Sequence, residues 1–143
     1  MANPYEGYTI FDYLSDIPVS EVPRFFTSGH IGYYNRAPEM IKELAPELAG
    51  KRVDRNMQDM MLNFIGGYDM AARGMPAEDA ISGARAYQAK DYFLEGRKAD
   101  AIGDYEENAA GVRAFSPEAG RMTDIELIRL AEQFARKRMA GDK

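Results

Sequence analysis

The chain has 143 residues, of which 45% are hydrophobic and 29% charged, and its formal net charge at pH 7 is −5. This length and composition are typical of one compact domain. Because cysteine is absent and His30 is the single histidine, the sequence excludes disulfides, zinc–thiolate and iron–sulfur sites, thiol nucleophiles and two-histidine metal sites. No apolar run reaches the roughly 20 residues that a membrane-spanning helix needs.

Residues 1–36 are irregular in pattern, and we expect them to form an N-terminal arm with short helices. Thr9 is predicted to cap a helix that runs to Ser15, with Asp12 answering the free N–H groups of its first turn. Ser20 is predicted to cap another that ends near Gly29. Prolines at positions 18 and 23 prevent anything longer.

Residues 37–143 are predicted to form a helical domain. Its first helix covers Pro38–Leu48, with a break or a tightened turn at Pro46. Asp54 is the predicted N-cap of the next helix, which ends at Gly74 and carries apolar residues at spacings of three and four: Met57, Met60, Met61, Phe64, Ile65, Tyr68, Ala71 and Ala72. This stripe favours a core face over an adaptable partner groove. The glycine pair at 66 and 67 indicates either a weak middle or close packing.

Three further segments complete the predicted domain. Pro76 opens a helix that Gly96 closes, and another helix covers Lys98–Ala114. Thr123 and Glu126 form a capping box at the start of the last helix, which Gly141 follows. No segment has the alternation of a strand. The sequence therefore predicts an all-α fold, a small irregular helical bundle.

An acidic and polar stretch between residues 91 and 108 is the main candidate for chemistry. Its members are Asp91, Glu95, Asp100, Asp104, Glu106, Glu107 and Asn108. If the two helices that carry them pack antiparallel, several carboxylates converge and can bind a hard cation or act as an acid/base pair. The commoner outcome is a solvated face paired with Lys90, Arg97 and Lys98. We therefore assign no catalytic residue, no metal ligand and no cofactor.

Two other polar features give weaker indications of function. His30 lies in a loop with Ser28 nearby, but catalysis also needs an orienting carboxylate, and a local hydrogen bond is the simpler interpretation. Basic residues near the C-terminus, Arg129, Arg136, Lys137, Arg138 and Lys143, complement the helix dipole. The net negative charge of the chain disfavours a nucleic-acid contact, and so do the acidic residues near this basic group: Asp124, Glu126, Glu132 and Asp142.

The arm holds eight of the sixteen aromatic side chains. Each buried ring removes about 150–250 Å² from water, so these rings either cover the chain's own helices or contact another subunit. Tyrosine is common at interfaces, and we treat all eight as candidate partner-binding residues: Tyr5, Tyr8, Phe11, Tyr13, Phe25, Phe26, Tyr33 and Tyr34. The expected partner is another protein or a second copy of the chain, with no membrane contact.

The segments 87–93 and 104–112 resemble small helical proteins of phages and prophages. In those proteins an Ala-Lys-Asp/Glu segment precedes an Asp-x-x-x-Asn-x-x-Gly segment, which Asp104, Asn108 and Gly111 match here. The resemblance implies a phage-associated origin, with a virion component as one expectation, and it implies no catalytic residues.

These features lead to one expected function and two alternatives. The leading expectation is a non-enzymatic interaction or assembly subunit of a larger complex, located in the cytoplasm or within a virion. The first alternative is a small hydrolase that uses acidic residues or a divalent cation. The second is an accessory protein that contacts nucleic acid.

Overall fold

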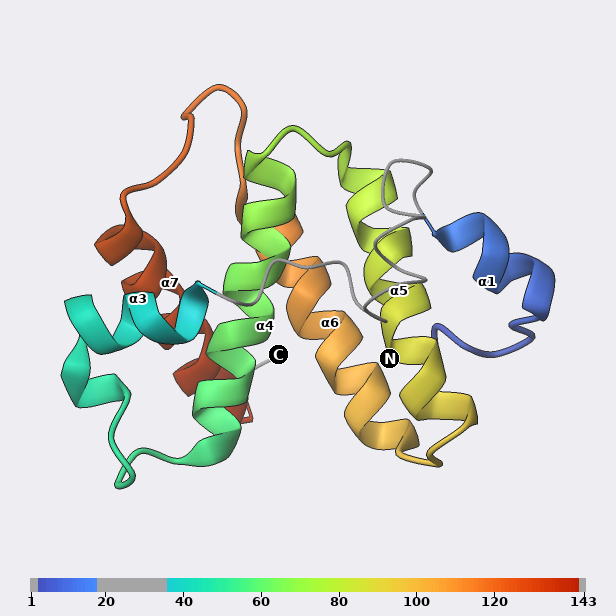
Figure 1. Ribbon diagram of the computed structural model, residues 1–143, viewed down its shortest axis with the longest axis horizontal. Coiled ribbons are helices and arrows are strands. Elements are labelled where there is room, and N and C mark those ends of the chain that lie inside the picture. Colours follow the sequence, from blue (N-terminus) through green and yellow to red (C-terminus); the bar gives the residue numbers. More distant parts are fainter. Residues whose placement is uncertain (1–2, 18–35, 142–143) are drawn as a thin grey trace.

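The computed structural model describes residues 3–17 and 36–141. In these residues the chain forms helices and no strand, which confirms the predicted all-α class. The elements are α1 (Ile10–Asp16), α3 (Ala37–Leu44), the 3₁₀ helix η2 (Pro46–Leu48), α4 (Arg55–Ala72), α5 (Ala77–Phe93), α6 (Lys98–Ala114) and α7 (Asp124–Met139). Figure 1 shows α4 and α6 at the centre, with α5 and α1 to one side and α3 and α7 to the other. None of these helices has the length and apolar character to cross a membrane.

The helix ends follow the predicted caps. Thr9 Oγ1 accepts a hydrogen bond from the Asp12 amide, and the Asp12 carboxylate accepts one from the Thr9 amide, which completes a capping box at α1. The same arrangement at Thr123 and Glu126 begins α7. The predicted helix Pro38–Leu48 is divided at Ala45 into α3 and η2, where Pro46 cannot continue the α-helical hydrogen bonding. The second short helix predicted in the arm lies outside the described residues.

The apolar stripe of α4 forms the centre of the core. Met57, Met61, Phe64 and Ile65 are all at most 5% exposed, and they pack against the buried face of α7 and against α3. Tyr68 is fully buried, and its hydroxyl accepts a 2.7 Å hydrogen bond from the Met122 amide. The stripe is therefore a core face, as its spacing predicts.

Two glycines let α4 and α6 approach closely. A Cβ atom at Gly67 would overlap the carbonyl oxygen of Asn108 and lie 3.1 Å from its Cα. A Cβ atom at Gly111 would overlap the carbonyl oxygen of Phe64 and lie 2.9 Å from the Tyr68 nitrogen. Close packing, and not a weak middle, explains the glycine in α4. Because the backbones meet here, polar residues of α6 are brought against α4 and buried.

The described part of the arm is attached to α5 by a partly buried ion pair between Asp16 and Arg85. Arg85 donates hydrogen bonds from Nε and Nη2 to the two oxygens of Asp16, at 2.7 and 2.8 Å. The Tyr8 hydroxyl donates a third, at 2.7 Å. Asp16 is only 5% exposed, so these three donors compensate for the burial of its charge.

Candidate functional site

A polar cleft lies between α4, α5 and α6, toward the turn that joins α5 to α6. These two helices run antiparallel (Figure 1). The cleft consists of a hollow of about 260 Å³ and one of about 410 Å³, which share Asp59, Asp91 and Asp104. Leu62, Asn63, Tyr87 and Gln88 complete the smaller hollow, and the larger one is completed by Asn56, Met60, Arg97, Ala99, Asp100, Gly103 and Glu107. We refer to the two hollows together as the polar cleft.

Asn63 joins two carboxylates at the wall of the polar cleft. Its Nδ2 donates to Asp104 Oδ1 at 3.0 Å and to Glu107 Oε1 at 2.9 Å. Glu107 is 5% exposed, and its other oxygen receives Arg138 Nε at 3.1 Å. Asn108, which is 1% exposed, donates from Nδ2 to the carbonyl oxygen of Asp104 at 2.9 Å. The close approach of α4 and α6 thus holds two carboxylates beside one another.

The proximity of these acids changes their titration. Burial, followed by the charge of Glu107, raises the pKa of Asp104 to about 7. Burial also raises the pKa of Glu107, against the opposing effects of Asn63 and Arg138. Asp104 is therefore close to half protonated at neutral pH. In the part of the chain that the structure describes, no three metal-ligating side chains are arranged to hold a metal ion.

The polar cleft also contains an unsatisfied polar atom. Gln88 of α5 lines the smaller hollow and is only 2% exposed, yet its carboxamide oxygen Oε1 accepts no hydrogen bond. A buried acceptor without a partner costs about 1–3 kcal/mol, and most such atoms in folded proteins are paired.

The acidic residues singled out in the sequence separate into groups. Asp91 and Asp104 meet in the polar cleft, as antiparallel packing predicts, whereas Glu95 is exposed beside Arg97. Glu107 and Asn108 are buried toward α4, so they do not belong to a solvated face. The remaining members lie at the edges of the cluster: Asp100 lines the larger hollow and Glu106 receives Arg138.

Sequence reasoning missed the wall that α4 and α5 contribute. Asp59 and Asn63 lie four residues apart and hence on one face of α4, beside the apolar stripe. That spacing is a signal that a search for polar pairs on apolar helices would find. Gln88 has no comparable signal, because a glutamine on a helix is usually solvated.

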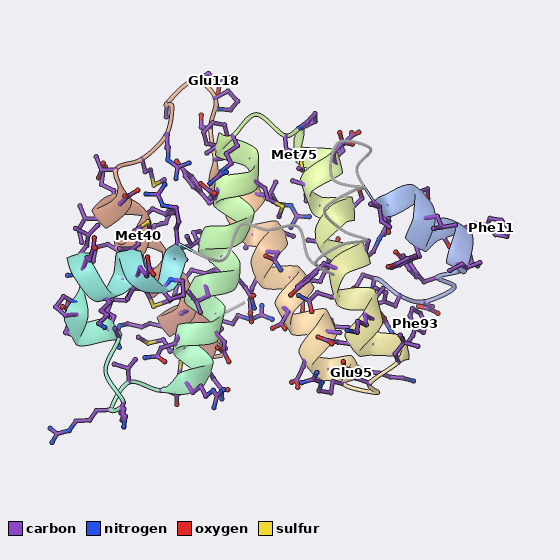
Figure 2. All side chains as sticks on the ribbon, viewed as in Figure 1. Phe11, Met40, Met75, Phe93, Glu95 and Glu118 are labelled. Carbon is purple, nitrogen blue, oxygen red and sulfur yellow. The ribbon has the colours of Figure 1, made fainter. Side chains whose placement is uncertain are left out.

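An apolar face lies on the opposite side of α5, between that helix and the N-terminal segment. A groove of about 440 Å³ is lined by Tyr8, Thr9, Ile10, Tyr13, Ala89, Lys90, Phe93 and Leu94. Three of these lining residues are large, apolar and exposed, namely Ile10, Phe93 and Leu94, and helix α1 exposes two more large apolar side chains, Phe11 and Leu14. Phe11 and Leu94 are the most exposed, at 79% each. Figure 2 shows Phe11 projecting from α1 away from the other helices. We refer to the five exposed residues and the groove as the apolar face.

The candidate partner-binding aromatics have different environments. Tyr5 is 3% exposed, stacks on Tyr92 with ring centroids 4.6 Å apart, and donates a 2.7 Å hydrogen bond to the Arg85 carbonyl oxygen. Tyr8 and Tyr13 are half-buried and line the groove, whereas Phe11 is exposed. The others, Phe25, Phe26, Tyr33 and Tyr34, lie outside the described residues, and so does His30.

The basic residues of α7 are largely engaged within the chain. Arg129 pairs with Glu47 at 2.8 Å, and Arg136 pairs with Glu132 at 2.9 Å. Arg138 reaches Glu107 at the wall of the polar cleft. These pairs offset the positive charge that a phosphate backbone would require.

No protein-family model matches the chain, and it has no match among curated proteins or solved structures. Any function must therefore be argued from the polar cleft and the apolar face themselves.

Proposed function

We propose that this chain is a non-enzymatic assembly subunit that associates with a second copy of itself through the apolar face. The observation that carries the proposal is the exposure of Ile10, Phe93 and Leu94 at one apolar groove, together with that of Phe11 and Leu14 on the same short helix as Ile10. Soluble monomers rarely leave such a set of large apolar side chains together in water, and contiguous apolar patches mark interaction sites.

The shape of the apolar face favours a second copy as the partner. Phe11 is a projecting side chain, and the groove beside it is a hollow lined by Ile10, Tyr13 and Phe93. In a twofold interface both copies present the same patch. A projecting side chain of each copy can therefore enter the hollow of the other, and the contact forms twice. Aromatic side chains seated in such hollows supply most of the binding energy in many interfaces.

Charge also favours association at this face. Among the described residues that line the groove, Lys90 is the one that is charged, although the chain carries a net charge of −5. Two copies that meet through these residues therefore bring few like charges together.

The test is the oligomeric state of the full chain, measured by sedimentation equilibrium across a range of concentrations. The wild type is expected to dimerise, and Phe11→Asp and Leu94→Asp are each expected to weaken the dimer at least tenfold. Leu44→Asp is the matched control, because Leu44 is an exposed leucine on α3, at the other end of the molecule. Circular dichroism verifies that all variants remain helical. A wild type that stays monomeric throughout, or variants that associate like the control, would refute the proposal.

The phage-particle setting is the finer part of this proposal. It is supported by the resemblance of segments 87–93 and 104–112 to phage and prophage proteins, and by nothing else. Detection of the chain in purified particles by mass spectrometry tests it separately from the dimer.

One observation favours the alternative of a small hydrolase. Asp104 sits in the polar cleft with a pKa of about 7, a value at which a carboxyl group can either donate or accept a proton. If the hydrolase uses a divalent cation, Mg²⁺, Mn²⁺ or Ca²⁺ must raise the melting temperature of the wild type and not that of Asp104→Asn. Without such a shift, the cation-dependent version is rejected.

A further inference from the structure

We infer that the polar cleft is a binding site for a small organic dication, a diamine or polyamine whose ammonium groups meet its carboxylates and the carboxamide oxygen of Gln88. This inference concerns a different surface from the apolar face and is independent of the assembly proposal. It depends on three features of the cleft: acidic charge without full compensation, the unsatisfied acceptor, and a partly apolar lining that extends over two adjoining hollows.

Carboxylates of the polar cleft lack the partners that compensate buried carboxylates elsewhere in the chain. Asp69 is 7% exposed and receives both Arg73, at 2.8 Å, and Arg121, at 2.7 Å. Within the described residues no lysine or arginine forms an ion pair with any of three cleft acids, Asp59, Asp100 and Asp104. Arg97 reaches Asp91 only at 3.5 Å, and the nearer partner of Arg97 is Glu95. In the part of the chain that the structure describes, the cleft thus gathers negative charge that ion pairs do not fully balance, which favours a cationic ligand.

Gln88 supplies an independent indication of a ligand. Its oxygen is buried in the wall of a hollow that also contains Asp91 and Asp104, and it receives no donor from the protein. The terminal torsion of a glutamine is broad, so the carboxamide can rotate in response to a donor in the hollow. An ammonium group has three N–H donors and no acceptor. One such group can therefore donate to the Gln88 oxygen and to a neighbouring carboxylate at the same time.

The extent of the polar cleft favours a ligand with two separated charges. The two hollows share Asp59, Asp91 and Asp104 at their junction, whereas Gln88 lines only the smaller hollow and Asp100 only the larger. Leu62 and Tyr87 in the smaller hollow, with Met60 and Ala99 in the larger, add apolar surface to a lining that is otherwise polar and acidic. A chain of methylene groups that links two ammonium groups combines the same two kinds of surface.

Isothermal titration calorimetry of the full chain at physiological ionic strength tests the inference, because exposed charges elsewhere are largely screened there. The probe is cadaverine, and 1,5-pentanediol is the matched neutral ligand, with the same carbon chain and hydroxyl groups in place of the ammonium groups. Mg²⁺ is a third arm that reports a preference for a bare divalent ion. Cadaverine is expected to bind at one site, and pentanediol is expected to show no heat.

Two variants locate the binding. Gln88→Met removes the acceptor with little change in volume and is expected to weaken cadaverine binding about tenfold or more, since hydrogen bonds to charged groups have that effect. Asp104→Asn is expected to weaken it about tenfold, because it removes a carboxyl group that a bound dication would hold deprotonated. Glu43→Gln removes a carboxylate from the exposed surface of α3 and should leave the affinity unchanged.

NMR of the ¹⁵N-labelled wild type provides a readout that does not depend on how the variants fold. Cadaverine should shift the side-chain amide signals of Gln88 and Asn63 together with the backbone signals around Asp59, Asp91 and Asp104. Cadaverine that fails to bind, shifts spread over acidic residues outside the cleft, equal binding by pentanediol, or preferential binding of Mg²⁺ would each overturn the inference.

Discussion

Replacement of Gly111 by alanine tests whether the contact between α4 and α6 builds the polar cleft. The added Cβ would overlap the carbonyl oxygen of Phe64 and lie 2.9 Å from the Tyr68 nitrogen, and both atoms belong to the backbone of α4. A flexible side chain can move aside, but here one of the two helices must shift. The shift separates Asn63 from Asp104 and Glu107, which it bridges at 3.0 and 2.9 Å.

The expected loss of stability follows from two opposing effects. Added volume in a packed interior costs about 1–3 kcal/mol, and contact between two backbones places this case at the upper end. Alanine gains about 1 kcal/mol over glycine in a helix interior. We therefore expect Gly111→Ala to lower the free energy of unfolding by about 2 kcal/mol, a substantial part of the 5–15 kcal/mol that is typical of folded domains.

Gly103→Ala is a control within the same helix. A Cβ atom there would meet only Arg138 Nη2 at 3.8 Å and Glu107 Oε2 at 3.9 Å, which are ordinary contacts. This variant should gain up to about 1 kcal/mol from helix propensity. Urea unfolding followed by circular dichroism measures both. The reasoning is wrong if the two alanine variants change stability in the same direction by similar amounts.

Three further predictions concern stability in the absence of any ligand. Gln88→Met should raise the free energy of unfolding by about 1 kcal/mol in urea titrations, because it removes a buried oxygen that has no hydrogen-bond partner. An unchanged or lower value would indicate that the oxygen is satisfied in solution. The pKa of Asp104 is about 7 in the folded chain and about 3.9 when unfolded, so the folded state binds more protons between those values and loses stability as pH rises through them. As the pH rises from 5 to 8, the free energy of unfolding of Asp104→Asn should therefore increase by about 1–2 kcal/mol relative to that of the wild type, after allowance for partial exposure of the carboxyl group. A difference between the two proteins that stays constant across that range would contradict the raised pKa. Thr123→Ala should lower the free energy of unfolding by about 1 kcal/mol, because it removes the side-chain cap of α7. The capping role would be contradicted if the melting temperature changed no more than it does for a substitution at an exposed position in the middle of a helix.

Features that depend on neighbouring residues were predictable from the sequence. The capping boxes at Thr9 and Thr123 form between residues three apart, so their hydrogen bonds are visible as a local pattern. The division at Pro46 and the bounds of α6 are local in the same sense. The stripe of α4 was predictable because large apolar side chains at spacings of three and four have few other uses.

The polar cleft was only partly predictable, because its contacts join residues far apart in the sequence. Asn63 meets Asp104 and Glu107 across 41 and 44 positions. Small residues are buried in the helices as well, among them Ala84 of α5 and Ala109 of α6. The Asp-x-x-x-Asn-x-x-Gly spacing did single out Asp104, Asn108 and Gly111, but their roles emerge only when α4 is placed against them.

Helix α5 contributes to both proposed surfaces, and this sharing makes the two proposals separable by experiment. Gln88 and Asp91 line the polar cleft, whereas Ala89 and Phe93 line the groove of the apolar face. Successive residues of a helix point in different directions, so a change on one side leaves the other side intact unless the helix itself moves. Leu94→Asp should therefore weaken association and leave cadaverine binding unchanged, and Asp104→Asn should weaken cadaverine binding and leave association unchanged. If each variant instead alters both measurements, α5 shifts as a unit and the two surfaces are linked through it.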